Sequence, residues 1–361
     1  MSLEHLADAL HIYRREQRRL QPENWVTMDL LRNFLPDWVS SGMPAPGSSG
    51  GERTEEKLRV LSALLAGETV PDALLGELFG FSNEALQKQL SATDPVLKPI
   101  PDHLVLLTFD DSTLDHYTIA LPELEKHGFH GIFYTTEMPA GPAMMGGWNP
   151  GFTDKTRYMT WDQIRELSER GNEIGNHTLH HDLDFPTSTE EEIRAAVLGL
   201  EEECEKHGVP KPINIGYPGG SLTAENMRLM HELGYLWGRG SQTGSSPIVV
   251  GDAWYDPYLH TPLCIPNRMA ISREKIITAI EGAVDGRIAQ FVYHEVTDGP
   301  MMQVPFAEQM DLIAQLGGRA ITTRELMEYI DPVLAWNYIN PIQPEQPKRG
   351  PLPGAPAPKE Q

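Results

Sequence analysis

From residue 103 onward the chain alternates short apolar runs with amphipathic segments, and this alternation constrains the fold more than any other feature. The apolar runs are HLVLLTFDD at 103–111, GIFYTT at 131–136, NEIGNH at 172–177, PINIGYP at 212–218 and IAQFVYH at 288–294. The amphipathic segments lie at 112–127, 161–170, 189–207, 224–233, 273–284 and 305–316. Strands that alternate with helices pair in parallel through helical crossovers. We therefore predict an α/β sheet or barrel for this part of the chain.

The regions on either side of this domain have a different character. Apolar residues at helical spacing predict a small helical region over residues 1–95, with a Gly/Ser/Pro-rich flexible linker near 40–56. The α/β domain then occupies 96–331. Residues 332–361 contain eight prolines, which predicts an extended tail without a core of its own. The helical region either packs against the domain or mediates self-association into a homo-oligomer, and the sequence leaves both open.

Charge and cysteine content limit the classes of function. The chain of 361 residues has 29 Lys and Arg against 51 Asp and Glu, a net charge of −22. Nucleic acid and anionic membrane surfaces would be repelled by this charge, so we expect neither as a partner. The two cysteines, Cys204 and Cys264, form no CxxC pair, which excludes thiolate metal sites and redox dithiols. Whether they form a disulfide stays open.

The sequence shows neither a bilayer-spanning apolar run nor a signal peptide. This predicts a cytoplasmic protein as the sequence is written. A secreted or periplasmic location applies instead if a leader has been trimmed.

Reactive residues follow the apolar runs where strands are expected to end. These residues are the Asp110–Asp111 pair, His177 with His181, the Gly219–Gly220 turn and His294. Each has a simpler interpretation: a helix N-cap, a chance spacing among 13 histidines, an ordinary turn and a core histidine. If the histidine segment were helical, its i and i+4 residues would share one face. Because the carboxyl ends of parallel strands share one edge, the four together predict a site.

Four motifs occur in one order along the chain: TFDD at 108–111, HTLHH at 177–181, Pro-Gly-Gly at 218–220 and YHE at 293–295. In this combination the chain resembles the polysaccharide deacetylase family, also called carbohydrate esterase family four or the nodulation-deacetylase homology domain. The resemblance covers residues 100–330. It implies an irregular (β/α) barrel of about seven units, a relative of the eight-fold barrel.

The resemblance also implies a role for each matching residue: catalytic base Asp110, metal ligands Asp111, His177 and His181, general acid His294, and an oxyanion site at the Gly219 N–H, with Tyr217 beside it as a substrate contact. Trp148 lies in a long loop at 139–151. Its ring either stacks on a sugar in a binding groove or packs on its own domain. His180 is expected to be structural rather than a ligand.

These residue types suit amide hydrolysis. Two imidazoles and one carboxylate hold a metal, most favourably zinc, with a coordination position open for water. Cobalt, nickel and manganese are alternatives. We therefore expect a metal-dependent hydrolase that removes acetyl groups from N-acetylated, or O-acetylated, sugars. Two alternatives stay open: hydrolysis of small non-sugar amides on the same fold, and a catalytically inactive carbohydrate-binding homologue.

The sequence departs from the family pattern at three positions. Ser112 stands where Gly is usual, Asp182 where Pro is common, and Gly216 where an Arg usually pins the catalytic Asp. We expect Arg239, at the next strand end, to replace that arginine beside Asp110. The alternative is that Arg239 is a surface residue.

The aspartate that pairs with the acid histidine in the family is not identified by the sequence. Asp252 and Asp256 are the candidates.

Overall fold

The computed structural model describes residues 56–57, 59–60, 63–64, 68–142, 148–240, 242–243, 254–257, 260–266, 272–297 and 303–339. The chain divides into two compact units, Met1–Leu97 and Lys98–Gln361. The expected linker near 40–56 and the first predicted helical segment lie almost entirely outside the described residues.

The first unit is helical where it is described. It contains α5 (Asp72–Phe79) and α6 (Asn83–Thr93). Gly80 ends α5 with a φ of 82°, a left-handed conformation that glycine adopts without strain. The Ser82 side chain begins α6 by accepting a hydrogen bond from the Ala85 N–H at 3.2 Å. A small apolar cluster holds the unit together: Val60, Val70, Leu75 and Leu78.

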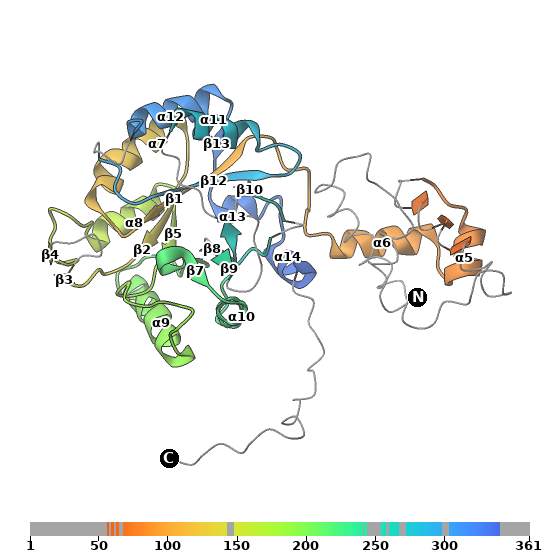
Figure 1. Ribbon diagram of the computed structural model, residues 1–361, viewed down its shortest axis with the longest axis horizontal. Helices are drawn as coiled ribbons and strands as arrows, with labels where there is room; N and C mark the ends of the chain where they lie inside the picture. The colour runs from red at the N-terminus through yellow and green to blue at the C-terminus, as the bar shows by residue number, and fades with distance from the viewer. Residues whose placement is uncertain are drawn as a thin grey trace, which may run out of the picture. The chain divides into compact units, whose positions relative to one another are not determined.

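The second unit is built around one barrel-like sheet (Figure 1). Its strands follow the order β10-β12-β1-β2-β5-β6-β8-β11, with β13 paired to β1. All neighbours pair in parallel except β10 with β12. The strands are β1 (Leu104–Asp110), β2 (Ile132–Thr135), β5 (Glu173–Asn176), β6 (Asn214–Gly216), β8 (Trp237–Gly240), β10 (Trp254–Tyr255), β11 (Ile265–Pro266), β12 (Ile288–Tyr293) and β13 (Arg319–Ala320). This confirms the predicted α/β barrel class.

Helices connect the parallel strands, as the amphipathic segments predicted. They are α7 (Leu121–His127), α8 (Trp161–Glu169), α9 (Glu190–Lys206), α10 (Ala224–Glu232), α11 (Arg273–Glu281), α12 (Phe306–Gln315) and α13 (Thr323–Leu326). A π-helix, η2 (His116–Ala120), precedes α7. Threonine capping boxes begin α8, α9, α10 and α13. Helices α7, α12 and α11 lie side by side over β1 and β12 (Figure 1).

Two short sheets lie apart from the barrel sheet. One pairs β3 (Gly141–Pro142) with β4 (Trp148–Asn149), and the other pairs β7 (Ser221–Leu222) with β9 (Gln242–Thr243).

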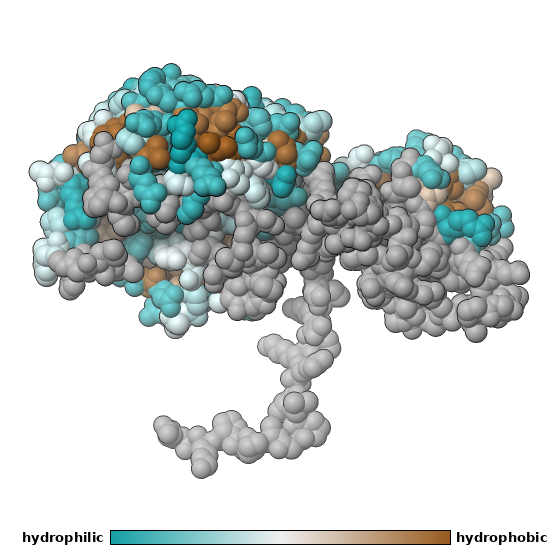
Figure 2. Space-filling view, turned by 45° about the horizontal axis from the view of Figure 1, so that its top comes forward, coloured by the Kyte–Doolittle hydropathy of each residue, from teal (hydrophilic) through white to brown (hydrophobic). Residues whose placement is uncertain are grey.

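The main core lies between the sheet and these helices. Phe109 of β1 stacks on Phe133 of β2 and on Tyr293 of β12, with ring centres 4.7 Å and 5.3 Å apart. On the face that Figure 2 shows, hydrophilic side chains are interspersed with apolar ones. Cys204 and Cys264 are buried free thiols in two different clusters, so they form no disulfide. No helix within the described ranges has the length and apolar character needed to cross a bilayer.

The prediction of an extended tail over residues 332–361 is wrong for the first part of this segment. Residues Pro332–Ile339 form a helix, α14. Trp336 is buried in a core cluster, and its ring stacks on His231 with the centres 4.8 Å apart. Burial of this aromatic side chain outweighs the proline-rich composition, and Pro332 occupies the first helical position, which tolerates proline. Residues 340–361 lie outside the described part of the chain.

The strand register brings the expected reactive residues to one edge of the sheet. Asp110 pairs with Tyr134, Phe109 with Tyr293, and Gly216 with Arg239. The residues that follow β1, β5 and β12 therefore leave the sheet at neighbouring points of its carboxyl edge.

Candidate active site

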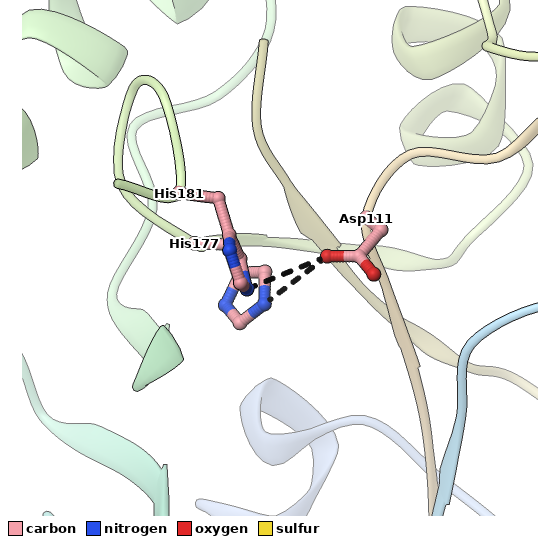
Figure 3. Close-up of side chains that lie close together, drawn as sticks. All are labelled: Asp111, His177 and His181. Carbon is pink, nitrogen blue, oxygen red and sulfur yellow. Dashed lines mark ion pairs between the residues drawn. The ribbon is translucent and has the colours of Figure 1, made fainter. Parts of the chain in front are cut away.

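The Asp111 carboxylate and the imidazoles of His177 and His181 converge at this edge (Figure 3). Asp111 directly follows β1, whereas both histidines follow β5. Asp111 Oδ1 lies 3.5 Å from His177 Nε2 and 3.7 Å from His181 Nε2. One ligand atom from each residue lies within 4.8 Å of the other two. Two distant segments thus direct three potential ligands at one point.

These three groups fit a divalent cation. Asp111 Oδ1 is buried and has no hydrogen-bond partner within the described residues, although two imidazole nitrogens face it. The separations are too long for hydrogen bonds. Ligand atoms about 2.0–2.2 Å from a tetrahedral zinc ion lie roughly 3.3–3.6 Å from one another, which is close to the observed spacing. A carboxylate with two imidazoles is also a donor set that leaves a coordination position open.

His177 is oriented as a ligand by the main chain of the next strand. Its Nδ1–H donates to the carbonyl oxygen of Gly216 at 2.6 Å. This fixes the proton on Nδ1 and leaves the Nε2 lone pair directed at Asp111. Burial lowers the pKa of His177 to about 4, so the ring is neutral at neutral pH. A neutral imidazole is the form that binds metal.

The end of β1 turns sharply to present Asp111. Asp111 and Ser112 have φ angles of 76° and 56°, in the left-handed region that favours glycine. Ser112 Oγ accepts from the Thr136 N–H at 3.0 Å, and its carbonyl oxygen accepts from the Met159 N–H at 2.9 Å. The backbone conformation explains why glycine suits position 112, and these hydrogen bonds hold serine there.

The histidine segment is not helical, contrary to the i, i+4 interpretation. Thr178 and His181 have φ angles of 62° and 53°, which bend the chain back. The Thr178 N–H donates to Asn176 Oδ1 at 2.8 Å, and the His181 N–H donates to Thr178 Oγ1 at 3.2 Å. This hydrogen-bonded bend, rather than a helical turn, brings the two imidazoles together. His180 lies elsewhere, with Nδ1 3.2 Å from the Glu137 carbonyl oxygen.

A second carboxylate, Asp110, lies beside the three ligands and is paired with Arg239. Arg239 Nη2 donates to Asp110 Oδ2, and both side chains are almost fully buried. The contact predicted from the sequence is therefore present. Burial alone would raise the pKa of Asp110, but the charge and hydrogen bond of Arg239, together with the charges that His177 and His294 carry when protonated, outweigh burial and lower this pKa. Asp110 is thus ionised at neutral pH, and its Oδ1 has no hydrogen-bond partner among the described residues.

Gly216 makes room for this arginine. A Cβ atom at position 216 would lie 2.9 Å from Arg239 Nη2 and 2.7 Å from Tyr134 Cγ. The Arg239 guanidinium carbon lies 5.0 Å from the centre of the Tyr134 ring. The absence of a side chain at position 216 therefore leaves the space that the Arg239 side chain occupies.

His294 follows β12 at the rim of the site. Its Nε2 lies 3.8 Å from Asp110 Oδ2, and half of its side chain is exposed. Of the two aspartates suggested as its partner, Asp256 is buried in the segment after β10, and Asp252 lies outside the described residues. In the part of the chain that the structure describes, Asp110 is the only carboxylate that forms an ion pair with His294.

The Pro-Gly-Gly turn places Gly219 at the surface, but not the Tyr217 side chain. Gly219 has a φ of 65° within the 3₁₀ turn η3 (Pro218–Gly220), which the Gly220 N–H closes by donating to the Tyr217 carbonyl oxygen at 2.8 Å. Tyr217 is fully buried, and its ring packs edge-on against Phe185. A substrate contact by the Tyr217 side chain is therefore wrong, because the ring belongs to the core.

The aromatic residues near the strand ends and in the 139–151 loop differ in their exposure. Trp148, in β4, is 70% exposed and stays a predicted substrate contact. Trp237 and Tyr255 are fully buried and belong to the packed interior. Trp254 is partly buried, and its Nε1–H donates to the Ala279 carbonyl oxygen at 2.8 Å. Tyr258 and the methionines of the 139–151 loop, Met144 and Met145, lie outside the described residues.

Two residues next to the site were missed by the sequence analysis. Asp115 accepts hydrogen bonds from the segment after His294, and His116 donates to the His294 carbonyl oxygen. Asp115 resembles an ordinary helix-start aspartate, and His116 a histidine within a helix. Neither pattern signals a contact with a segment so distant in the sequence.

Residues 98–237 match the sequence profile of the family described as polysaccharide deacetylase. The matched segment runs from before β1 to the start of β8 and includes Asp110 and the three potential metal ligands. This part of the chain is therefore similar to the polysaccharide deacetylase family. The predicted resemblance to this family is thereby confirmed, although Arg239 and His294 lie beyond the matched segment.

The chain is also similar to individual proteins. A peptidoglycan-N-acetylglucosamine deacetylase of Bacillus cereus is 26% identical over 159 residues, which are 42% of this chain and 65% of the relative. The Bacillus subtilis protein YxkH, provisionally assigned as a polysaccharide deacetylase, is 23% identical over 142 residues, 39% of this chain and 46% of the relative. The solved structure of Bacillus subtilis peptidoglycan deacetylase PdaC is 17% identical, with 65% of this chain and 92% of that one covered and a TM-score of 0.40. The chain spans less than two thirds of the length of the two curated relatives.

Proposed function

We propose that the protein is a metal-dependent deacetylase that hydrolyses the acetamide of N-acetylated saccharides. The observation that carries the proposal is the convergence of Asp111, His177 and His181 next to an ionised carboxylate, Asp110. The three ligands and the free base are what hydrolysis of an unactivated amide requires together. The family and its peptidoglycan-deacetylating relative support an acetylated saccharide as the substrate class.

The three ligands would hold one divalent ion, zinc in the first place. When bound, such an ion lowers the pKa of a coordinated water to about 7 and polarises an acyl oxygen. Cobalt, nickel or manganese suit the same nitrogen and oxygen donors.

Asp110 is the residue that takes the proton from the attacking water. Its Oδ1 has no hydrogen-bond partner among the described residues, whereas Arg239 holds Oδ2. The arginine thus keeps the carboxylate ionised and fixes its orientation without occupying the oxygen that accepts the proton.

His294 is the residue that returns a proton. Its Nε2 lies 3.8 Å from Asp110 Oδ2. Half of the His294 side chain is exposed, which leaves room for a substrate nitrogen. The water oxygen forms a bond to the acyl carbon, the carbon–nitrogen bond breaks, and His294 protonates the departing amine. The Gly219 N–H, at the surface of its turn, would donate to the acyl oxygen as negative charge develops there.

Acetate release from N-acetylated chito-oligosaccharides by the zinc-loaded protein tests this function. We expect turnover in the wild type and none in His177→Ala, which also loses stoichiometric zinc. His180→Ala is the matched control from the same motif and keeps both zinc and turnover. A wild type that binds zinc but releases no acetate contradicts the proposal. Ammonia release or ring opening of a small cyclic amide would instead establish the small-amide alternative.

A further inference from the structure

The segment that carries His294 leaves the sheet just before this residue. β12 ends at Tyr293, which pairs with Phe109 of β1. Beyond it, residues 294–297 belong to no strand. The His294 ring itself is half exposed, and its ion pair within the described residues is the 3.8 Å approach to Asp110. The position of this ring therefore depends on what holds the backbone of residues 294–297.

Asp115 holds the far end of that segment. Its Oδ2 accepts three hydrogen bonds: from the Val296 N–H at 2.6 Å, the Thr297 N–H at 2.9 Å and the Thr297 hydroxyl at 2.9 Å. Its other oxygen, Oδ1, accepts a hydrogen bond from the Thr113 hydroxyl at 2.6 Å. This bond fixes the orientation of the carboxylate relative to the segment that follows β1. All the contacts are to a charged acceptor, which makes each stronger than a neutral hydrogen bond.

His116 holds the near end. Its Nε2–H donates to the carbonyl oxygen of His294. The ring is fully buried and packs against Phe109 and Phe133, with ring centres 5.5 Å and 6.0 Å away. Its Nδ1 has no partner in the described part of the chain, so the carbonyl oxygen alone selects the Nε2–H tautomer. His116 begins the π-helix η2, an irregularity that recurs at functional sites.

We propose that Asp115 and His116 form a clamp that positions His294 over Asp110. The clamp replaces the sheet hydrogen bonds that end at Tyr293 with side-chain bonds from the start of the helical segment that follows β1. Asp110 ends β1 and Asp111 directly follows it, so the short segment 110–116 sets both the base and the position of the acid. The inference rests on the proposed function, since it takes His294 to be the proton donor. Asp115 and His116 are positioning residues and do not touch the substrate.

The clamp predicts a selective loss of activity. Departure of an amine needs a proton from His294, whereas departure of 4-nitrophenolate does not. Asp115→Ala and His116→Phe should lower kcat for the N-acetyl oligosaccharide about 10- to 100-fold, with KM changed less than about twofold. Hydrolysis of 4-nitrophenyl acetate should change less than about threefold. His294→Ala should show the same selective loss of amide hydrolysis. Its loss gives the largest effect expected for variants that only displace His294.

Conservative variants separate positioning from folding. Asp115→Asn keeps an oxygen for the three donors, and its amide can donate to the Thr113 hydroxyl, so we expect most of the amide activity to return. His116→Gln places an N–H close to the position of Nε2 and should rescue likewise. Thr118→Ala, on the exposed side of the same π-helix, is the matched control with wild-type rates. If Asp115→Ala does not fold, Thr297→Val, which loses one of the three bonds, still provides the test.

Hydrogen exchange gives a readout that does not need the loaded enzyme. The Val296 and Thr297 amides should exchange at least about tenfold faster in Asp115→Ala than in the wild type. Unchanged exchange, or equal losses on the amide and the aryl ester, overturns the clamp. A wild type inactive on both substrates contradicts the proposed function instead, and the exchange experiment then still decides whether the clamp exists.

Discussion

Replacing Arg239 by methionine should destabilise the fold and impair the base at the same time. The variant leaves the Asp110 carboxylate without the cation to which it is bonded. The two side chains are only 2% and 4% exposed, so solvent screening does not reduce the effect. Removing one partner of a buried ion pair costs about 3–5 kcal/mol. We expect a loss of this size in the free energy of unfolding at pH 7, measured by urea denaturation of the metal-free protein.

The pH dependence of this loss has a defined sign. In the wild type the pKa of Asp110 lies below its ordinary value of 3.8, so its stabilising contribution is present above that value and is lost as the pH falls through the lowered pKa. Without Arg239, burial is opposed only by the histidines, and the pKa of Asp110 rises. The folded variant then takes up a proton more readily than the unfolded chain. The difference between wild type and variant should therefore be largest near pH 7 and become smaller toward pH 4.

Two further measurements test whether Arg239 stabilises the ionised form of Asp110. The acid limb of the pH–rate profile should move to higher pH in Arg239→Met, whereas zinc content should stay the same because no ligand is changed. The double variant Asp110→Asn with Arg239→Met should be more stable than Arg239→Met alone, since it buries no charge. If the single variant is as stable as the wild type, or if the stability difference does not depend on pH, Arg239 does not stabilise the ionised Asp110.

Four variants test individual residues. Asp111→Ala and His177→Ala should each abolish zinc binding, measured by metal analysis after dialysis, and all turnover. Asp110→Asn should keep stoichiometric zinc and lose about 10²–10⁴-fold in kcat, because it removes the proton acceptor alone; full turnover would show that another group is the base. Tyr217→Phe should leave kcat and KM unchanged and should not lower stability, since its buried hydroxyl has no hydrogen-bond partner among the described residues. A raised KM there would restore its predicted substrate contact.

Much of the barrel could be predicted because local pattern and tertiary structure agree there. The strand containing Phe109 is a continuous apolar run that is buried on both faces, and the amphipathic segment that became α9 has one apolar stripe. Agreement ends where packing overrides composition. Trp336 turned the start of a proline-rich tail into a helix, and Tyr217 joined the core although it precedes a surface turn.

The candidate site also contains some residues that could be predicted from the sequence and some contacts that could not. Asp111, His177 and His181 could be identified because their motifs keep the order of the family along the chain. Arg239 could be suggested because a missing arginine at 216 required a replacement. The contacts of Asp115 and His116 with residues 294–297 could not be predicted, since most of their partners are backbone groups, which leave no trace in the sequence. The bend at Thr178 was equally hidden, because i, i+4 spacing suits a helix and a tight bend alike.

The close approach of position 216 to Arg239 restricts the order in which related sequences can exchange these two arginines. An arginine at 216 would need the volume that the Arg239 guanidinium and the Tyr134 ring now fill. If the arginine at 216 were lost first, the intermediate would bury a carboxylate without a counter-charge; if Arg239 were gained first, it would meet an occupied space. We therefore expect homologous chains to carry one arginine or the other, and an ancestor that tolerated the exchange to have had stability to spare.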